Sequence, residues 1–253
     1  MDGRVVSGDD ARMDVGFFVT CLTDTFFPRV GEAAVRVLRH FGCRVHFPPQ
    51  QTCCGQPAYN SGFHEHAAAL LRRMPKAFAS CEFVVTPSAS CAAMIKEHGP
   101  QLAGVQADEV RRLAAKTWEF CTFLRDRLHV NIAACLKPRE PVTFHYPCHA
   151  RGIYEVTDLR EWLGRLDVRP PPRTDLCCGF GGLFAVDFPE LSGRMLDDKL
   201  EMLAASGARL VICNEAACTL QMAGGAHRRG LPLRFRHLAE LLAESLELME
   251  GEA

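Results

Sequence analysis

The chain has 253 residues, of which 48% are hydrophobic and 23% charged, and its formal net charge is -1. A chain of this length buries roughly three quarters of its unfolded surface, so it forms a core without needing disulfides or metals. The charge argues against a nucleic-acid-binding surface, no apolar run is long enough for a transmembrane segment, and the first residues do not form a signal peptide, so we expect a soluble, cytoplasmic protein.

Apolar runs rich in β-formers alternate with helical patterns along the chain, which is typical of an α/β fold. The first half begins with a predicted strand that ends at Cys21, and a glycine at position 42 stops the helix that follows it. The elements predicted for this half are strands at 15–20, 44–47 and 83–86, helices at 29–41 and 63–79, and a helical connector at 107–128.

The second half repeats this order, with strands predicted at 142–146 and 210–213. The motif Cys-Cys-Gly occurs twice, at 53–55 and 177–179. Three pairs of cysteines have nearly equal separations: 127 residues for Cys21 and Cys148, 124 for Cys53 and Cys177, and 127 for Cys91 and Cys218. We therefore interpret the chain as two pseudo-symmetric repeats, each a small, mostly parallel sheet with flanking helices: a flexible N-terminus at 1–13, a first half at 14–136 and a second half at 137–253.

The repeated cysteines all lie in loops that follow predicted strands. In parallel α/β sheets, ligand sites form in the loops beyond the carboxyl ends of the strands. Each half therefore brings four cysteines together: Cys21, Cys53, Cys54 and Cys91 in the first, and Cys148, Cys177, Cys178 and Cys218 in the second.

Four converging thiolates are the usual ligands of a [4Fe–4S] cluster. Because cytosolic thiols stay reduced, thirteen cysteines indicate metal ligation or redox chemistry rather than cross-links. The glycine after each cysteine pair allows a sharp turn and a close approach of the backbone to a cluster. Near predicted helix starts, Cys91 and Cys218 also have their thiolate forms favoured by free backbone N–H groups.

Other interpretations of the cysteines are less favoured. Adjacent cysteines have Cα atoms about 3.8 Å apart, too close for an ordinary disulfide. Structural zinc accepts four thiolates, but its sites usually contain C-x₂₋₄-C pairs, which these eight cysteines lack. Five cysteines without partners in the repeat are interpreted as packing residues: Cys43, Cys81, Cys121, Cys135 and Cys213.

Few other residues indicate a cofactor. The glycines at 179–182 do not complete G-x-G-x-x-G, because Phe184 occupies the last position. His145 and His149 could be ligands or proton carriers, but we favour polar histidines hydrogen-bonded to their neighbours. Without a nicotinamide or flavin motif there is no obvious hydride acceptor. These features favour a subunit of an oxidoreductase over a complete enzyme.

The doubled cysteine pattern resembles the CCG cysteine-rich domain of the heterodisulfide reductase B subunit and of the iron–sulfur subunit of glycolate oxidase. The segments FFVTCLTDTFFP, CCGQPAYNSG, VVTPSASCAAM, FHYPCHARG and CCGFGGLFAV are most similar to the lactate utilization protein A family. The resemblance extends from about residue 14 to residue 244, nearly the whole chain.

This resemblance implies a subunit of a three-protein system that oxidises L-lactate to pyruvate, with a second iron–sulfur protein and a third small subunit as partners. The family's cysteine positions match the eight named above. In the heterodisulfide reductase relatives each motif ends in C-x-x-C, where this chain has Ser88 and Glu215. A fifth thiolate per half is therefore missing, which favours two [4Fe–4S] clusters over noncubane ones. A thiol–disulfide redox protein and, less favoured, a zinc-stabilised interaction protein remain alternatives.

Overall fold

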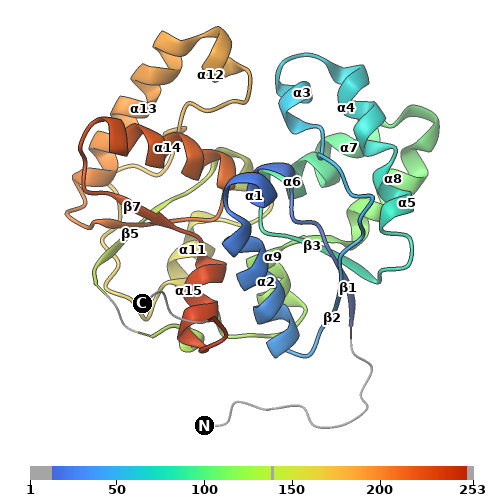
Figure 1. Ribbon diagram of the computed structural model, residues 1–253, viewed down its shortest axis with the longest axis horizontal. Coiled ribbons are helices and arrows are strands. Elements are labelled where there is room, and N and C mark those ends of the chain that lie inside the picture. Colours follow the sequence, from blue (N-terminus) through green and yellow to red (C-terminus); the bar gives the residue numbers. More distant parts are fainter. Residues whose placement is uncertain (1–12, 138–139, 250–253) are drawn as a thin grey trace.

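The computed structural model describes residues 13–137 and 140–249, and shows two parallel sheets with helices around them (Figure 1). The first sheet has the order β2-β1-β3-β4 and the second the order β5-β6-β7. The strands are β1 (Asp14–Phe17), β2 (Arg44–His46), β3 (Phe83–Thr86), β4 (Thr117–Glu119), β5 (Val142–His145), β6 (Leu210–Cys213) and β7 (Arg234–Arg236). The predicted α/β class with two repeated units is confirmed. Residues 1–12 of the predicted flexible N-terminus lie outside the described residues.

The two sheets share their topology. β1 pairs in parallel with β2 on one side and with β3 on the other, at Gly16 with His46 and with Val84. β5 pairs in parallel with β6, and on its other side a single parallel bridge joins Val142 to Val168. The bridge thus takes the place of β2 in the second half, and β5, β6 and β7 correspond to β1, β3 and β4.

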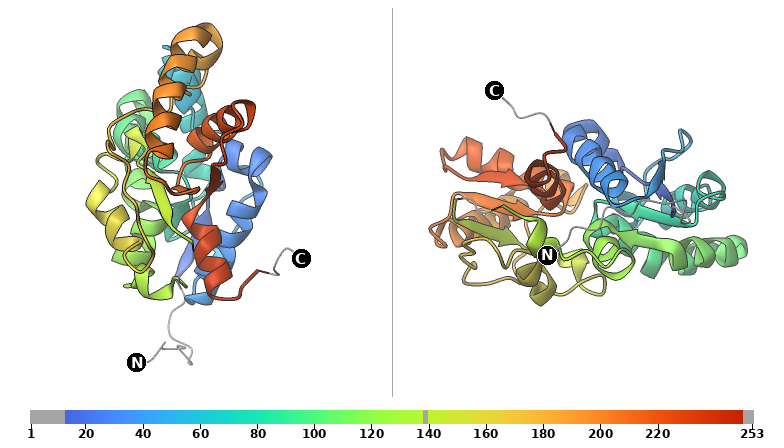
Figure 2. Two further views of the ribbon diagram at one scale, coloured as in Figure 1. Left: turned by 90° about the vertical axis from the view of Figure 1, so that its left-hand side faces the viewer. Right: turned by 90° about the horizontal axis from the view of Figure 1, so that it is seen from below.

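The helices lie on both faces of the sheets, as Figure 2 shows from two further directions. In the first half they are α1 (Cys21–Phe26), α2 (Pro28–His40), α3 (Gln56–Asn60), α4 (His64–Leu71), α5 (Met74–Ala77), α6 (Ala89–Ala93), the π-helix η1 (Met94–His98), α7 (Gly99–Leu102), the 3-10 helix η2 (Gly104–Gln106), α8 (Ala107–Lys116), α9 (Phe120–Asp126) and α10 (Ile132–Cys135). In the second half they are the 3-10 helix η3 (Cys148–Ala150), α11 (Val156–Trp162), α12 (Phe184–Asp187), α13 (Pro189–Ala204), α14 (Ala216–Arg228) and α15 (Leu238–Ser245). In the described part of the chain, no helix has the length and apolar character needed to cross a membrane.

One hydrophobic core is shared by both halves. It contains Val15 and Phe17 of β1 together with Val142 and Phe144 of β5, and α15 contributes to it beside α2. Alternate strand residues point the other way, into a separate core in each half, as Val84 does in the first and Val211 in the second. Strands buried on both faces in this way are typical of parallel sheets, and the shared core explains why the two halves pack as one body.

Three predicted elements were wrong in extent. The strand predicted at 15–20 is shorter, because β1 ends at Phe17. The helix predicted at 63–79 is divided into α4 and α5, and Pro75 lies in the first turn of α5. A proline inside a helix removes a backbone hydrogen bond and clashes with the preceding turn, so a new helix has to begin there. The connector predicted as helical at 107–128 contains β4, which pairs with β3 between α8 and α9.

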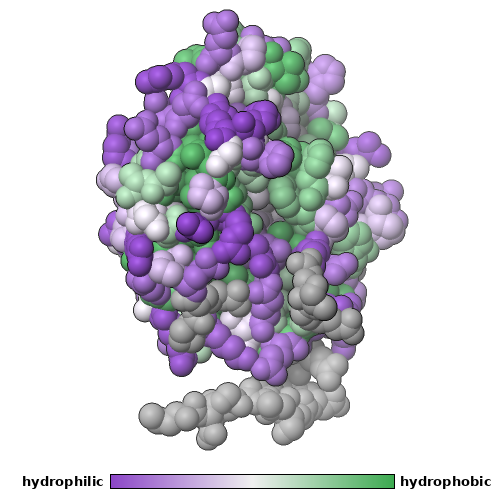
Figure 3. All heavy atoms as spheres, turned by 60° about the vertical axis from the view of Figure 1, so that its left-hand side comes forward, coloured by the Kyte–Doolittle hydropathy of each residue, from purple (hydrophilic) through white to green (hydrophobic). Residues whose placement is uncertain are grey.

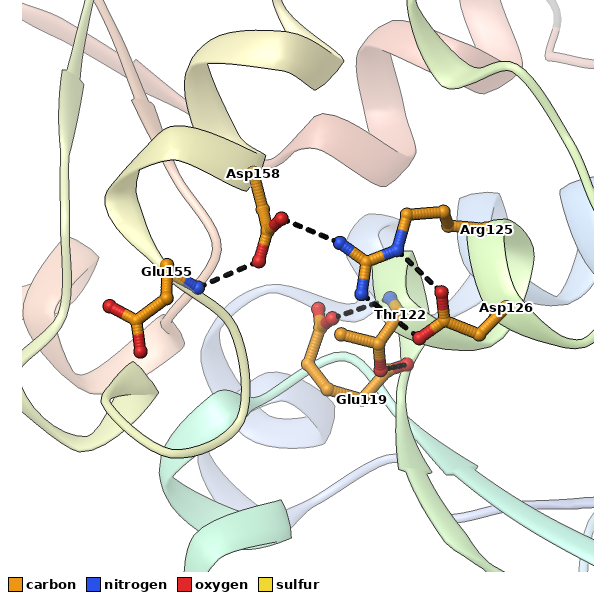
Figure 4. A network of polar contacts seen from close by, with 6 residues as sticks. All are labelled: Glu119, Thr122, Arg125, Asp126, Glu155 and Asp158. Atoms are coloured by element: carbon orange, nitrogen blue, oxygen red, sulfur yellow. Dashed lines mark hydrogen bonds and ion pairs between the residues drawn. The ribbon is translucent and has the colours of Figure 1, made fainter.

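Polar contacts also join the halves. Arg125 on α9 forms an ion pair with Asp158 on α11 at 2.7 Å and also binds the neighbouring Asp126 (Figure 4). His237, which caps α15, contacts the backbone carbonyl of Pro87 through Nε2 at 2.9 Å, while its Nδ1 accepts from the amide of Ala239. Both ring nitrogens of this buried histidine are therefore used by the fold.

We expect His237 to make stability depend on pH. Burial lowers its pKa from 6.5 to about 4. The unfolded chain therefore takes up this proton first, so the stability is full above about pH 6.5 and falls as the pH drops towards 4. Between pH 7.5 and 5 the loss is about 2 kcal/mol. Urea unfolding at both pH values measures it. His237→Asn keeps a capping oxygen but does not titrate, so an equally steep pH dependence in that variant would contradict this assignment.

Candidate functional site

All eight cysteines of the two repeated sets line one cavity of about 140 Å³. Its lining residues lie in the loops and helix starts that follow the carboxyl ends of strands in both sheets. The structure thus brings together every predicted site cysteine, in one place rather than two: Cys21 at the start of α1, Cys53 and Cys54 in the loop after β2, Cys91 in α6, Cys148 in η3, Cys177 and Cys178 before α12, and Cys218 in α14.

Within each half the thiols are in contact. In the first, Cys21 Sγ lies 3.7 Å from Cys53 Sγ, and Cys54 Sγ lies 3.2 Å from Cys91 Sγ. In the second, the corresponding inner pair, Cys178 and Cys218, is 3.0 Å apart, and Cys148 hydrogen-bonds Cys177. All thirteen cysteines are free thiols. The sulfur contacts thus divide the cavity into two sets of four.

Each set has a buried side and an accessible side. The inner thiols Cys54, Cys91, Cys178 and Cys218 are buried, whereas Cys21 is exposed and Cys53, Cys148 and Cys177 are half-buried. A group held by either set is therefore enclosed by protein on one side and reachable on the other.

One thiol in each set is poised to lose its proton. Hydrogen bonds from Cys21, Cys54 and the amide of Gly55 lower the pKa of Cys53 to about 3, and the equivalent contacts lower that of Cys177 to about 2. The donors hold their protons more firmly, so the pKa values of Cys21 and Cys148 are raised by these same bonds. Each set therefore contains one thiol that loses its proton more readily than the others, as a thiol must when it becomes a metal ligand.

The glycine after each cysteine pair adopts a left-handed conformation, with φ of 89° at Gly55 and 81° at Gly179. A Cβ at Gly55 would lie 3.0 Å from the carbonyl oxygen of Ala67 on α4, and one at Gly179 would lie 2.7 Å from that of Ser192 on α13. Glycine is thus needed for the turn and for close packing on a helix. We expected these glycines to leave room for a cofactor. The two contacts show instead that they leave room for the backbone of a helix.

The two positions that lack a fifth cysteine contact each other across the halves. The hydroxyl of Ser88 donates to the carboxylate of Glu215 at 3.0 Å, and the amide of Ser90 donates to the same carboxylate at 3.0 Å. These residues line the cavity, and burial raises the pKa of Glu215. No local signal indicates this contact, because Ser88 and Glu215 are 127 residues apart.

The two histidines near Cys148 differ. His149 Nδ1 lies 3.5 Å from Cys148 Sγ, so it contacts its neighbour as expected. His145 is 1% exposed, and neither of its ring nitrogens has a hydrogen-bond partner among the described residues. One of its nitrogens and the sulfurs of Cys178 and Cys218 all lie within 4.8 Å of one another. The prediction of a hydrogen-bonded loop histidine was wrong for His145, which ends the buried strand β5 and faces the inner thiols.

The five cysteines interpreted as packing residues are not among those that line the cavity. Cys43, Cys81, Cys121 and Cys213 are buried and Cys135 is half-buried. Cys81 packs against the backbone of β1, where a Cβ at Gly16 would lie 2.7 Å from its sulfur. These positions are consistent with small apolar side chains in the core.

The family model for the cysteine-rich CCG domain matches residues 15–96 and again 142–223. Lactate utilization protein A of Geobacillus kaustophilus is 42% identical over 91% of this chain and 98% of its own length. The protein of that name from Halalkalibacterium halodurans is 39% identical over 91% of this chain and 96% of its own. Among solved structures, an aspartate racemase homologue from Pyrococcus horikoshii covers 93% of this chain and 98% of its own at 11% identity, with a TM-score of only 0.34.

Proposed function

Because the chain belongs to the family of cysteine-rich CCG-domain proteins that includes lactate utilization protein A, we propose that it is an iron–sulfur electron-transfer subunit of a multi-protein system that oxidises L-lactate to pyruvate. The observation that carries the proposal is the meeting of two four-thiol sets around one cavity. Cys21, Cys53, Cys54 and Cys91 are the proposed ligands of one cluster, and Cys148, Cys177, Cys178 and Cys218 those of the other.

The residues at the cavity fit such clusters. Each half offers four soft sulfur donors, and the four of each set contain no C-x₂₋₄-C pair of the kind found in structural zinc sites. The buried, unpartnered ring of His145 also needs an explanation, because a buried polar group without a partner costs about 1–3 kcal/mol. A bound inorganic group beside it supplies the missing partner. When bound, each [4Fe–4S] cluster would carry one electron. Two clusters would together hold the two electrons that the oxidation of one lactate releases.

The rest of the site positions the two sets. The hydrogen bonds from Ser88 and Ser90 to Glu215 join the two halves beside the inner thiols Cys91 and Cys218. The exposed Cys21 and the half-buried Cys148 leave the outer side of each set open to an electron-transfer partner. The arrangement therefore joins the halves on the inside and leaves the cysteine sets accessible from outside.

The proposed partners are a second iron–sulfur protein and a third small subunit. Large apolar side chains are exposed on segments next to the cavity, with Phe63 53%, Val186 71% and Phe188 59% exposed. On the face that Figure 3 shows, hydrophilic residues separate most of the hydrophobic ones. Exposed apolar residues beside a redox site are suited to contact with another protein, which supports a subunit that works only with its partners.

A thiol–disulfide redox protein is the second candidate, and the shared cavity favours it. Both cysteine sets face the same space, so a disulfide that entered there would lie between them. The two functions differ in their substrates. Reduction of a small disulfide by the isolated, reduced chain would favour the second candidate, whereas dependence on partner proteins and lactate favours the first.

Protein purified without oxygen is expected to be brown and to contain about eight iron atoms per chain, since each [4Fe–4S] cluster uses four thiolates. Metal analysis and a visible absorption spectrum check this. Sulfide analysis is the matched measurement, because a cluster of this type contains as much sulfide as iron. A colourless protein with two zinc ions and no iron would instead support the zinc-stabilised interaction protein.

A further inference from the structure

The repeat makes the surroundings of the two cysteine sets directly comparable. Phe18 lies three residues before Cys21, and His145 lies three residues before Cys148. On the helices, Ala67 and Ser192 occupy the same place, because each presents its carbonyl oxygen to the glycine of a Cys-Cys-Gly motif. Lys199 follows Ser192 by seven residues, as Met74 follows Ala67. His145 and Lys199 thus correspond to Phe18 and Met74.

The inner side of the first set is largely apolar and carries no positive charge from Phe18 or Met74. Phe18 and Met74 are 0% and 2% exposed, and both belong to the hydrophobic cluster that contains Cys54 and Cys91. Neither side chain carries a charge or an N–H group. A cluster held by the first set therefore has a mostly apolar wall on its buried side, where the side-chain amide of Gln56, which has no described partner, is an uncharged donor.

The inner side of the second set is polar and positively charged. His145 is buried with a ring nitrogen near the sulfurs of Cys178 and Cys218. Lys199 is 0% exposed, and its Nζ donates to the carbonyl of Leu176, the residue before Cys177, at 3.0 Å. Burial lowers the pKa of Lys199, and the nearby cysteine side chains partly oppose this change.

Both groups favour the reduced form of a cluster beside them. Reduction adds one negative charge, and a buried cation stabilises that charge more strongly than it would in water. Hydrogen bonds to cluster sulfur and the net local charge are two of the factors that set a cluster's reduction potential. The neutral imidazole of His145 has one N–H to donate, and no described protein group accepts it.

We propose that His145 and Lys199 give the cluster of the second half a higher reduction potential than the cluster of the first half, so that the first electron to enter the protein resides at the second site. The inference rests on the proposed function, because it requires one cluster per half. It assigns the second site as the place where electrons collect.

A redox titration of the anaerobic protein, followed by electron paramagnetic resonance, tests the proposal. The wild-type protein is expected to show two transitions. Cys54→Ser, which keeps the second set, should retain the transition of higher potential, and Cys178→Ser should retain the lower one. Lys199→Met and His145→Phe, which copy the residues of the first half, should each lower only the higher transition.

Two further variants sharpen the test. His145→Gln keeps a side-chain N–H and should move the potential less than His145→Phe; it also serves if the phenylalanine variant does not fold. Lys116→Met is the matched control: its Nζ donates to the carbonyls of Phe78 and Cys81, at the amino end of β3 and thus the opposite edge of the sheet. Neither transition should move in this variant.

Equal potentials in the wild-type protein, or retention of the higher transition by Cys178→Ser, would overturn the inference. So would Lys199→Met and His145→Phe variants that leave both transitions in place or shift them equally. In these cases two clusters are still present and the proposed function stands. A wild-type protein without iron, or with a single cluster, would instead mean that the proposed function itself is wrong.

Discussion

Cys178→Ser is expected to remove about half of the iron from the protein and to leave the cluster of the first half in place. Cys178 is 3% exposed, and its sulfur lies 3.0 Å from that of Cys218. A serine hydroxyl is a hard oxygen donor that replaces a soft thiolate poorly, so the second set loses one of four ligands. Cys54→Ser is the equivalent change in the first half, with the same expected loss. Iron analysis of both anaerobic proteins measures the effect.

The control for these variants is a cysteine outside the cavity. Cys135 on α10 is half-buried, so Cys135→Ser removes a thiol at little cost to packing and is expected to leave the iron content unchanged. Cys81→Ser is also expected to keep its iron, although its buried hydroxyl lowers stability. Loss of all iron in either Cys54→Ser or Cys178→Ser would mean that the halves share one cluster. Such a shared cluster is a specific alternative because all eight cysteines line the same cavity.

The cysteine pattern predicted which residues come together. β3 and β6 have the predicted bounds, 83–86 and 210–213, because a short apolar run between turn-forming residues has few other ways to fold in an α/β chain. The cysteines follow such strands, so the parallel topology alone places them at one edge. The repeated spacing also predicted which cysteine of the first half corresponds to which cysteine of the second. These local signals were enough for the fold class and for the gathering of the eight thiols.

The features of the fold and of the site that were not predicted depend on tertiary contacts. β4 was missed because its three residues continue a helical pattern, and only pairing with β3 makes them a strand. The shared position of the two sets was not predicted, since the sequence does not show that both sheets contribute to one core and one cavity. The hydrogen bond between Ser88 and Glu215 joins residues 127 positions apart. His145 was misjudged because burial, and not its loop neighbours, determines its surroundings.

Deleting the gene for this protein is expected to abolish growth on L-lactate and to leave growth on pyruvate unchanged. The expectation follows from the family membership and from the proposed role, in which electrons from lactate must pass through the cysteine sites. Pyruvate is the proposed product, so a cell supplied with it no longer needs the oxidation step. Returning the wild-type gene should restore growth on lactate, whereas Cys178→Ser should not. Cys135→Ser is the matched complementation control and should restore it fully.

The same variants separate the subunit model from its alternatives in vitro. The purified chain alone is expected not to oxidise lactate, because iron–sulfur clusters transfer single electrons and do not accept a hydride. Activity should appear when the partner iron–sulfur protein and the third subunit are added, and should disappear with Cys178→Ser if electrons pass through the second site. Strong lactate oxidation by the isolated chain would refute the subunit model. Normal growth on lactate after deletion would point instead to another 2-hydroxy acid or to a disulfide as the substrate, since the cysteine sites would then serve a different electron donor.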